Sequence, residues 1–353
     1  MKAKIWRNRK LFGRRVIKTA LAVFLTSLIC QWIGWPPVFA VITAIVTIEP
    51  TAAASIKKGI VRFPASAIGS AFAVLFIFLF ENSPLTYALA AFFTIITCYR
   101  LKLHAGLLVA TLTSVAMIEV IDTNLFISFF TRLGTTTIGL LVSTLVNMFV
   151  FPPNYSKQIM TNIHDLLQKI GEELDIIIKQ KLHTNNESKQ KEEMVRRFHT
   201  LKKSLDQTER LLQFQEEEAK YHRHSKEMQK MFAFEKKNLS RLRLIHYHIG
   251  NLVNTSINNV CWSDKQCEDI SNMVETLTDF MKHPDHYKAS DYKLQLKALM
   301  EQFWESKQPE QSHTSMFTPE VIILYELVSI YNIVEAILIS EQRYHYYEDE
   351  DKA

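Results

Sequence analysis

The sequence predicts an all-α membrane protein, with six transmembrane helices followed by a cytoplasmic helical bundle. Three observations support this prediction. Long apolar runs fill the first 153 residues, charged residues lie between these runs, and the remainder of the chain is polar with a helical repeat of apolar positions. We therefore expect a six-span transmembrane domain over residues 1–153 and a cytoplasmic helical domain over residues 154–353.

Charge divides the chain at the same point. Residues 1–153 hold 14 Lys and Arg against 4 Asp and Glu, whereas the remainder holds 27 against 32. Basic residues beside apolar runs orient helices across a bilayer. Nucleic-acid binding would need a free basic face, so the sequence argues against nucleic acid as a partner and for the lipid bilayer.

The apolar runs are bounded by charged or proline-containing segments, as membrane spans are. A helix needs about 20 residues to cross a bilayer, so the second run is short and would be completed by neighbouring residues at the interfaces. The six expected spans are 16–33, 36–48, 60–80, 84–99, 103–121 and 133–151.

The connections between these spans have a strong charge asymmetry. If the N-terminus is cytoplasmic, the inner segments carry twelve Lys and Arg, and the outer segments carry one. Such an excess marks the cytoplasmic side. We therefore expect a multi-pass protein of the cell membrane with both termini in the cytoplasm.

Beyond residue 154, apolar residues recur at spacings of three and four between Ile163 and Ile178, which is typical of an amphipathic helix. Further helices are expected around 198–212, 226–260, 264–282 and 288–307. Thr318, Pro319 and Glu320 form a helix start, with a capping hydroxyl, a proline in the first turn and an acid behind it.

The region of the expected spans contains a repeated sequence motif. Residues 62–69 read RFPASAIG and residues 132–139 read RLGTTTIG, which both fit the pattern R-x-x-[AT]-[ST]-x-I-G, 70 residues apart. Three spans separate the two copies, so the copies would run in opposite directions. This pattern favours an inverted repeat of three plus three spans, as many transporters have; chance similarity of small-residue helices is the alternative.

The stretch PPVFAVITAIVTIEPT, with SIKKGIVR and IGSAFA after it, resembles the aromatic acid exporter family within the fusaric acid resistance group. Glu49 stands where that family has a neutral residue, and Ala65-Ser66 stands where Gly-Thr is usual. The positions that match the family pattern are Pro37, Phe39, Ala40, Pro50, Thr51, Lys58, Gly59, Arg62 and Gly69.

The resemblance covers about residues 5–155, and the helical C-terminal half resembles a Gram-positive branch of the family. It implies a transporter that exports small organic anions, in particular aromatic carboxylic acids, or a passive organic-anion channel. It also implies a homo-oligomer, because half-size units of this kind pair.

Three basic residues in or beside the spans are candidate sites for the carboxylate of a substrate, because charges in lipid are costly and usually functional. Lys18 is a candidate at the inner end of the first span, or an anchor that reaches the interface. Arg62 lies at the inner mouth of the third span, where it either binds an anion or orients the helix. Arg132 is expected in the outer segment 119–132, where it binds a carboxylate bidentately or pairs with Glu119 or Asp122.

Polar residues of the second span complete the set of candidates. Glu49 is a candidate for proton coupling, or an exposed loop acid. The hydroxyls of Thr43 and Thr47 lie one turn apart and would line a path, or bond back to their own helix.

The sequence has no P-loop, no GxSxG and no GxGxxG, so we expect neither an enzyme nor a nucleotide cofactor. His222 and His224, like His246 and His248, are two residues apart and would point to different sides of a helix, so no metal site is expected. A non-transporting membrane-anchored scaffold or sensor, acting through the cytoplasmic domain, is the alternative function.

Overall fold

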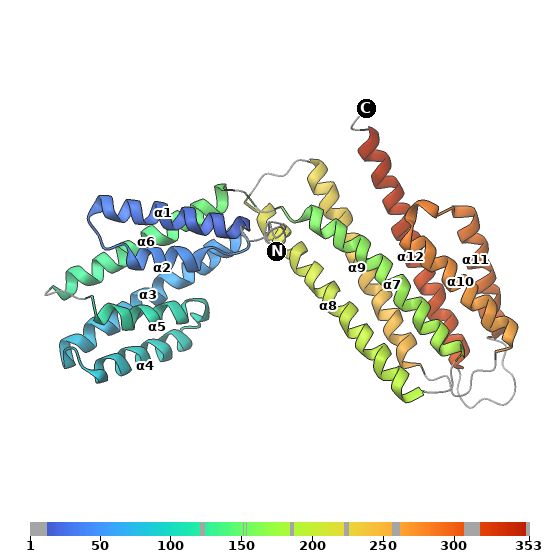
Figure 1. The fold of residues 1–353 in the computed structure, drawn as a ribbon, viewed down its shortest axis with the longest axis horizontal. Helices are drawn as coiled ribbons and strands as arrows, with labels where there is room; N and C mark the ends of the chain where they lie inside the picture. The colour runs from blue at the N-terminus through green and yellow to red at the C-terminus, as the bar shows by residue number, and fades with distance from the viewer. Residues whose placement is uncertain are drawn as a thin grey trace, which may run out of the picture. The chain divides into compact units, whose positions relative to one another are not determined.

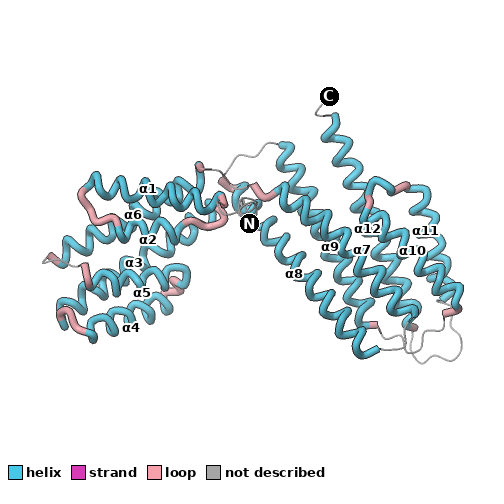
Figure 2. Tube along the Cα trace, viewed as in Figure 1, coloured by secondary structure: helices cyan, strands magenta, loops and turns pink. Residues whose placement is uncertain are grey.

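A computed structural model describes residues 13–120, 124–150, 152, 154–183, 187–221, 226–255, 262–306 and 318–350. Every regular element in these residues is a helix (Figure 2). Contacts divide the chain into two compact units: a first unit, Met1–Asn154 with Phe214–Arg223, and a second unit, Tyr155–Gln213 with His224–Ala353. The all-α class predicted from the sequence is confirmed for the described residues.

Besides residues 214–219, the end of α8 (Glu187–Ala219), the described part of the first unit contains six helices. These helices pack side by side (Figure 1). Helix α3 packs against α4, α5 and α6, whereas α6 packs against α1, α2 and α3. The helices are α1 (Arg14–Ile33), α2 (Val38–Thr47), α3 (Ala52–Phe80), α4 (Pro84–Arg100), α5 (His104–Ile118) and α6 (Leu125–Phe149).

Two helices begin about eight residues earlier than the apolar runs predicted. The expected spans 60–80 and 133–151 correspond to α3 and α6, which start at Ala52 and Leu125. The first turns of α3 hold Lys57 and Lys58, which hydropathy assigned to a loop although lysine is a good helix former. Arg132, expected in a connection, therefore lies inside a helix, and Arg62, expected at the mouth of the third span, lies well inside α3.

Small residues let the helices of the first unit approach closely. A Cβ on Gly69 would lie 2.5 Å from the carbonyl oxygen of Ala110 in α5, and one on Gly139 would lie 2.4 Å from that of Ala40 in α2. In contrast, large apolar side chains on the outside are exposed, such as Trp32, Phe78 and Phe126 at 89, 73 and 79%. This inside-out pattern suits a surrounding of lipid.

In the part of the chain that the structure describes, four helices have the length and apolar composition of membrane spans: α1, α3, α6 and Pro319–Gln342 within α12. Helices α2 and α5 are apolar but shorter. These helices support a membrane protein. The number of spans depends on which of α2, α4, α5 and α12 cross the membrane.

The second unit is a bundle of long helices around one apolar core (Figure 1). Helix α7 packs against α9 and α10, and α12 packs against α9 and α11. The helices are α7 (Ser156–His183), α8 (Glu187–Ala219), α9 (Lys226–Asn254), α10 (Asp264–Lys282), α11 (Ala289–Ser306) and α12 (Pro319–Glu350), with a short 3-10 turn, η2 (Pro284–His286).

The apolar positions of the second unit are those that its helical periodicity predicts. Ile163 and Ile178 are about 1% exposed in the shared core. Helix α12 begins at Pro319, directly after Thr318, as predicted. Its apolar residues Leu327, Val334 and Ile337 are buried in that core. The apolar composition of α12 is therefore accounted for by packing within the bundle.

Candidate functional site

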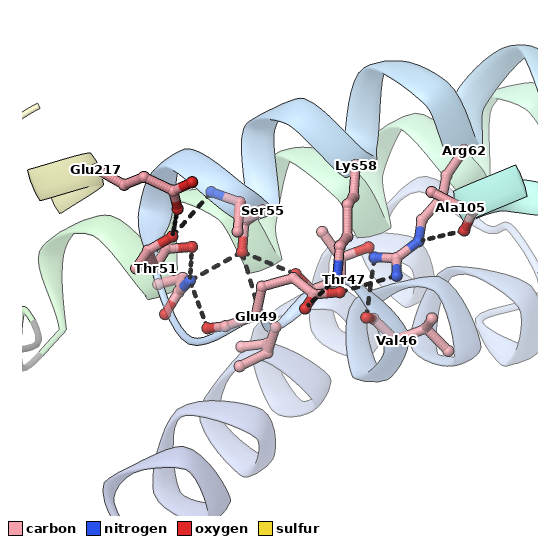
Figure 3. A network of polar contacts seen from close by, with 12 residues as sticks. Val46, Thr47, Glu49, Thr51, Ser55, Lys58, Arg62, Ala105 and Glu217 are labelled. Atoms are coloured by element: carbon pink, nitrogen blue, oxygen red, sulfur yellow. Dashed lines mark hydrogen bonds and ion pairs between the residues drawn. The ribbon is translucent and has the colours of Figure 1, made fainter. Parts of the chain in front are cut away.

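A network of polar side chains surrounds the C-terminal end of α2, a helix of ten residues (Figure 3). The last carbonyls of a helix have no partner within it. Arg62 Nη1 donates to the Val46 carbonyl at 3.0 Å, and Ser55 Oγ donates to the Thr47 carbonyl at 2.8 Å. Arg15 Nη2 donates to the Ile48 carbonyl at 3.1 Å. Side chains thus stabilise a helix end that would otherwise leave unpaired carbonyls in an apolar environment.

Arg62 is the centre of this network and is 7% exposed. It lies on the third turn of α3 and forms an ion pair with Glu49, at 2.9 Å between Nη2 and Oε1. Its Nε also donates to the Ala105 carbonyl at the start of α5, at 3.2 Å. The structure therefore gives the guanidinium of Arg62 three protein acceptors, and the predicted role in anion binding stays a prediction.

Glu49 pairs with Lys58 as well, at 2.8 Å. Partial burial tends to raise the pKa of Glu49, but hydrogen bonds from Lys58 and Arg62 outweigh it, so the pKa lies below its usual value. In this conformation Glu49 is ionised at neutral pH. Proton coupling through Glu49, which remains a prediction, would need these ion pairs to break first.

Lys18 is buried and donates to Asn147, to the backbone oxygen at 3.1 Å and to Oδ1 at 2.8 Å. The amide of Asn147 in turn donates to the carbonyls of Glu49 and Thr51, both at 3.1 Å, and to Ser55 Oγ at 2.8 Å. Asn147 therefore links α1, α6 and the connection after α2. It is a central polar residue that the sequence analysis did not select.

The two threonine candidates bond to their own helix. Thr43 Oγ1 donates to the Phe39 carbonyl at 2.8 Å, and Thr47 Oγ1 donates to the Thr43 carbonyl at 2.7 Å. Both residues are buried. Their hydroxyl hydrogens are used within α2, so each hydroxyl oxygen has only its acceptor capacity left for a ligand.

Arg132 lies two turns inside α6, not in the outer segment where the sequence analysis placed it. It is 3% exposed. Its Nη2 donates to Thr113 Oγ1 of α5 at 2.6 Å, and its guanidinium carbon lies 4.1 Å from the centre of the Phe39 ring of α2. Helix α6 continues over this residue because its charge is buried against neighbouring helices and is not exposed to lipid.

Arg132 lines a pocket of about 960 Å³ between the ends of α1 and α5 and the starts of α2 and α6. This volume is in the range of small-molecule sites. The pocket is lined by aromatic, apolar, hydroxyl and amide side chains: Gln31, Trp35, Pro36, Phe39, Met117, Val120, Asn124, Ile127, Ser128, Thr131 and Thr135, besides Gly34.

Two nitrogens of Arg132, Nε and Nη1, are buried without a hydrogen-bond partner among the described residues. The described ion pairs include none between Arg132 and an acid. Glu119, one of its two predicted partners, accepts from Tyr87 and is exposed; Asp122, the other, lies outside the described residues. A buried guanidinium with free donors is costly and suits an anion that enters the pocket.

The aromatic wall of this pocket was also missed by the sequence analysis. Trp35 packs over Gly134, where a Cβ would lie 2.3 Å from the indole ring. The signal in the sequence was the pair Gly34-Trp35, since Gly34 ends α1 with φ of +82° and turns the chain back. A glycine in this left-handed conformation at the end of a helix places the next side chain against the neighbouring elements.

Comparisons with known proteins find a matching family and relatives that cover most of the chain. Residues 10–150 match the family described as "Aromatic acid exporter family member 1". The chain is 46% identical to a UPF0421 protein of Oceanobacillus iheyensis, over 93% of this chain and 95% of that protein. It is 41% identical to a UPF0421 protein of Bacillus cereus over 96% of both chains, and 37% identical to one of Staphylococcus saprophyticus over 93 and 97%. The chain therefore belongs to the aromatic acid exporter family, in the branch whose Gram-positive relatives are called UPF0421 proteins.

Proposed function

We propose that the protein is a membrane transporter that exports small organic anions, with aromatic carboxylic acids as the substrate class. Membership of the exporter family supports transport. The observation that carries the substrate class is Arg132, a buried guanidinium with two free nitrogens in a pocket walled by Trp35 and Phe39.

The chemistry of the pocket suits such a ligand at both ends. A guanidinium attracts a carboxylate and donates hydrogen bonds to it. Nε and Nη1 of Arg132, which lie on different edges of the guanidinium, have no hydrogen-bond partner among the described residues. Trp35 and Phe39 give the lining of the pocket an aromatic, apolar part, which suits an aromatic ring. Burial of the pair away from water strengthens the attraction between the charges.

Binding of benzoate to the purified protein tests this site. Replacing Arg132 by Gln removes the one charged side chain among the described residues that line the pocket, and loss of one partner of a buried charge pair costs about 2–5 kcal/mol. We expect calorimetry to show binding of benzoate weakened at least about thirtyfold in Arg132→Gln, with Arg132→Lys between the two.

Arg100 provides a control with the same change of charge. It is an exposed residue at the end of α4, so Arg100→Gln should leave benzoate binding unchanged. Benzyl alcohol, which has the ring without the carboxylate, should not bind measurably. Equal binding of benzoate by wild type and Arg132→Gln would refute the site.

The proposed membrane topology has six spans formed by α1 to α6, with both termini in the cytoplasm. The charge asymmetry of the connections supports this orientation. Helix α2 would cross together with the segments beside it, since its ten residues measure only about 15 Å. We assign α12 to the second unit because its apolar side chains lie in that core.

Coupling and assembly complete the proposal. Dependence of flux on a proton gradient would separate an ion-coupled exporter from a passive channel. A homo-oligomer is expected from the half-size membrane unit, and the mass of the purified complex would test it. If neither aromatic nor other organic acids cross liposomes that contain the protein, the scaffold or sensor alternative gains.

A further inference from the structure

The two halves of the first unit correspond residue by residue at a constant offset of 70. Helix α1 begins at Arg14 and α4 at Pro84; α3 ends at Phe80 and α6 at Phe149. The offset needs no insertion or deletion over this length. Identical residues occur at both positions of these pairs: Ala40 and Ala110, Thr43 and Thr113, Glu49 and Glu119, Arg62 and Arg132, Ile68 and Ile138, Gly69 and Gly139.

The packing of the two halves repeats as well. Helix α3 packs on α5 through Gly69 and Ala110, and α6 packs on α2 through the corresponding Gly139 and Ala40. The glycine Cβ positions would lie 2.5 and 2.4 Å from the facing carbonyl oxygens. The same contact between the halves thus occurs twice, with the roles of the two halves exchanged.

An approximate twofold axis follows from the contact between the halves. Ser66 Oγ and Thr136 Oγ1, which are equivalent positions, lie 3.4 Å apart. Farther along the same two helices, Ser55 near the start of α3 bonds to Asn147 near the end of α6. Helices α3 and α6 are therefore antiparallel and cross near Ser66, so the equivalent positions Arg62 and Arg132 lie on opposite sides of this crossing.

The two equivalent acid–arginine pairs are in different states. Glu49 and Arg62 form a closed ion pair whose side chains are 11 and 9% exposed. At the other end Glu119 is exposed and accepts from Tyr87. Arg132 lines an open pocket, and its Nε and Nη1 have no partner among the described residues. One end of the unit is thus closed by its own carboxylate, and the other is open.

We propose that Glu49–Arg62 and Glu119–Arg132 are the two gates of one pathway, and that Arg62 is a second carboxylate site, equivalent to Arg132. This inference rests on the proposed function and extends it. Each acid stands in for the carboxylate of the substrate while its end is closed. In the opposite state Glu119 binds Arg132, Glu49 leaves Arg62, and Arg62 receives an aromatic carboxylate from the other side.

This exchange explains why the closed end is stable without substrate. A buried arginine needs an anionic partner, and Glu49 supplies one when no ligand is present. A substrate can shift the equilibrium between two such states only through a difference in affinity. Because each end has an acid and an arginine at equivalent positions, the acid–arginine pair can form in either state, as alternating access around a repeat requires. The Glu49 end has a further cation, Lys58, whose equivalent position is Ser128.

Thiol labelling of the purified protein tests the gates without any substrate. Thr47, beside the closed gate, is fully buried, whereas Ser128 lines the open pocket. We would introduce a single cysteine as Thr47→Cys or as Ser128→Cys after replacing all four native cysteines by Ala. A hydrophilic maleimide should label Ser128→Cys rapidly and Thr47→Cys slowly.

Glu49→Gln should open the closed end. Loss of one partner of the buried pair should raise the labelling rate of Thr47→Cys about tenfold or more and lower that of Ser128→Cys. Arg62→Gln breaks the same pair from the other side and should give the same shift. Glu119→Gln should leave Ser128→Cys fully reactive, because it can no longer close that end.

Glu81→Gln is the control, since Glu81 is an exposed acid at the end of α3 and faces neither arginine. Labelling rates within twofold of wild type in both Glu49→Gln and Arg62→Gln would overturn the gates, as would faster labelling at both cysteines. Neither result depends on benzoate. The gate hypothesis can therefore be refuted without refuting the proposed function, and the reverse.

Discussion

A guanidinium buried among helices loses the hydration that it has in water, and Arg132 regains only part of it from Thr113 and the Phe39 ring. Arg62 has the same position in the other half of the unit but is fully engaged by Glu49 and two carbonyls. Because the two residues are equivalent but differ in their partners, we assign the Arg62 end to a closed state and the Arg132 end to an open state. Without this comparison, neither arginine would indicate an open or a closed end.

In the second unit, Glu235 on α9 is fully buried. Burial raises the pKa of its carboxyl from 4.5 to about 7, against a smaller lowering by the hydroxyl of Ser156. An acid whose pKa is raised on folding stabilises the folded state below the unfolded pKa and loses that contribution as pH rises towards the folded pKa. The second unit should therefore lose up to about 3 kcal/mol of stability between pH 4.5 and 7.

Glu235→Gln should remove this dependence, because the amide is neutral at every pH. Amide hydrogen exchange in α7 and α9, corrected for intrinsic rates, should show the variant more protected than wild type at pH 8 and equal near pH 5. Glu192→Gln, an exposed change on α8, is the control. The same pH dependence in wild type and Glu235→Gln would contradict the assignment.

At the scale of helices, close backbone contact holds the first unit together. Gly69 and Gly139 face carbonyl oxygens at distances that leave no room for a methyl group, whereas nothing lies within 4 Å of a Cβ at Gly13. Overpacking of this kind costs about 1–3 kcal/mol. Gly69→Ala and Gly139→Ala should lower the melting temperature in detergent by several degrees, and Gly13→Ala should leave it unchanged.

Similar losses in the two glycine variants would also support two equivalent helix contacts between the halves. A melting temperature unaltered in both would show that the helices can separate without loss of stability. In that case the close packing between α3 and α5, and between α2 and α6, would be wrong.

Most helices could be predicted from the sequence, because apolar periodicity and hydropathy report burial directly. The starts of α3 and α6 could not, since Lys57 and Arg132 reduce hydropathy in residues that are nevertheless helical. Hydropathy treats a charge as a loop signal, but Arg132 is stabilised by a hydroxyl and an aromatic ring from other helices. Such partners are distant in sequence and invisible to a local pattern.

The site could be predicted only in part for the same reason. The sequence analysis selected Arg62, Glu49 and Arg132 as separate candidates, and the structure joins the first two and leaves the third with free donors. Asn147 was missed because its importance comes from bonds to α1 and to the connection after α2. The sequence alone shows that Glu49 and Glu119 are 70 residues apart, like Arg62 and Arg132. The motif used in the sequence analysis covers only residues 62–69 and 132–139.

At the scale of the whole chain, the topology makes a separate prediction. With six spans, a cysteine at exposed Lys102, between α4 and α5, should be cytoplasmic, whereas one at exposed Asn82, between α3 and α4, should be outside. In intact cells an impermeant maleimide should label Asn82→Cys and spare Lys102→Cys until the membrane is opened. The reverse pattern would invert the topology, and labelling of both would exclude six spans.

Flux of benzoate in liposomes tests the central claim most directly. The purified protein should move radiolabelled benzoate across the bilayer, and Arg132→Gln should reduce the initial rate at least about thirtyfold at low benzoate, while Arg100→Gln retains it. Flux that is absent from the wild-type protein, or that persists unchanged in Arg132→Gln, would contradict an exporter that binds aromatic carboxylates at Arg132.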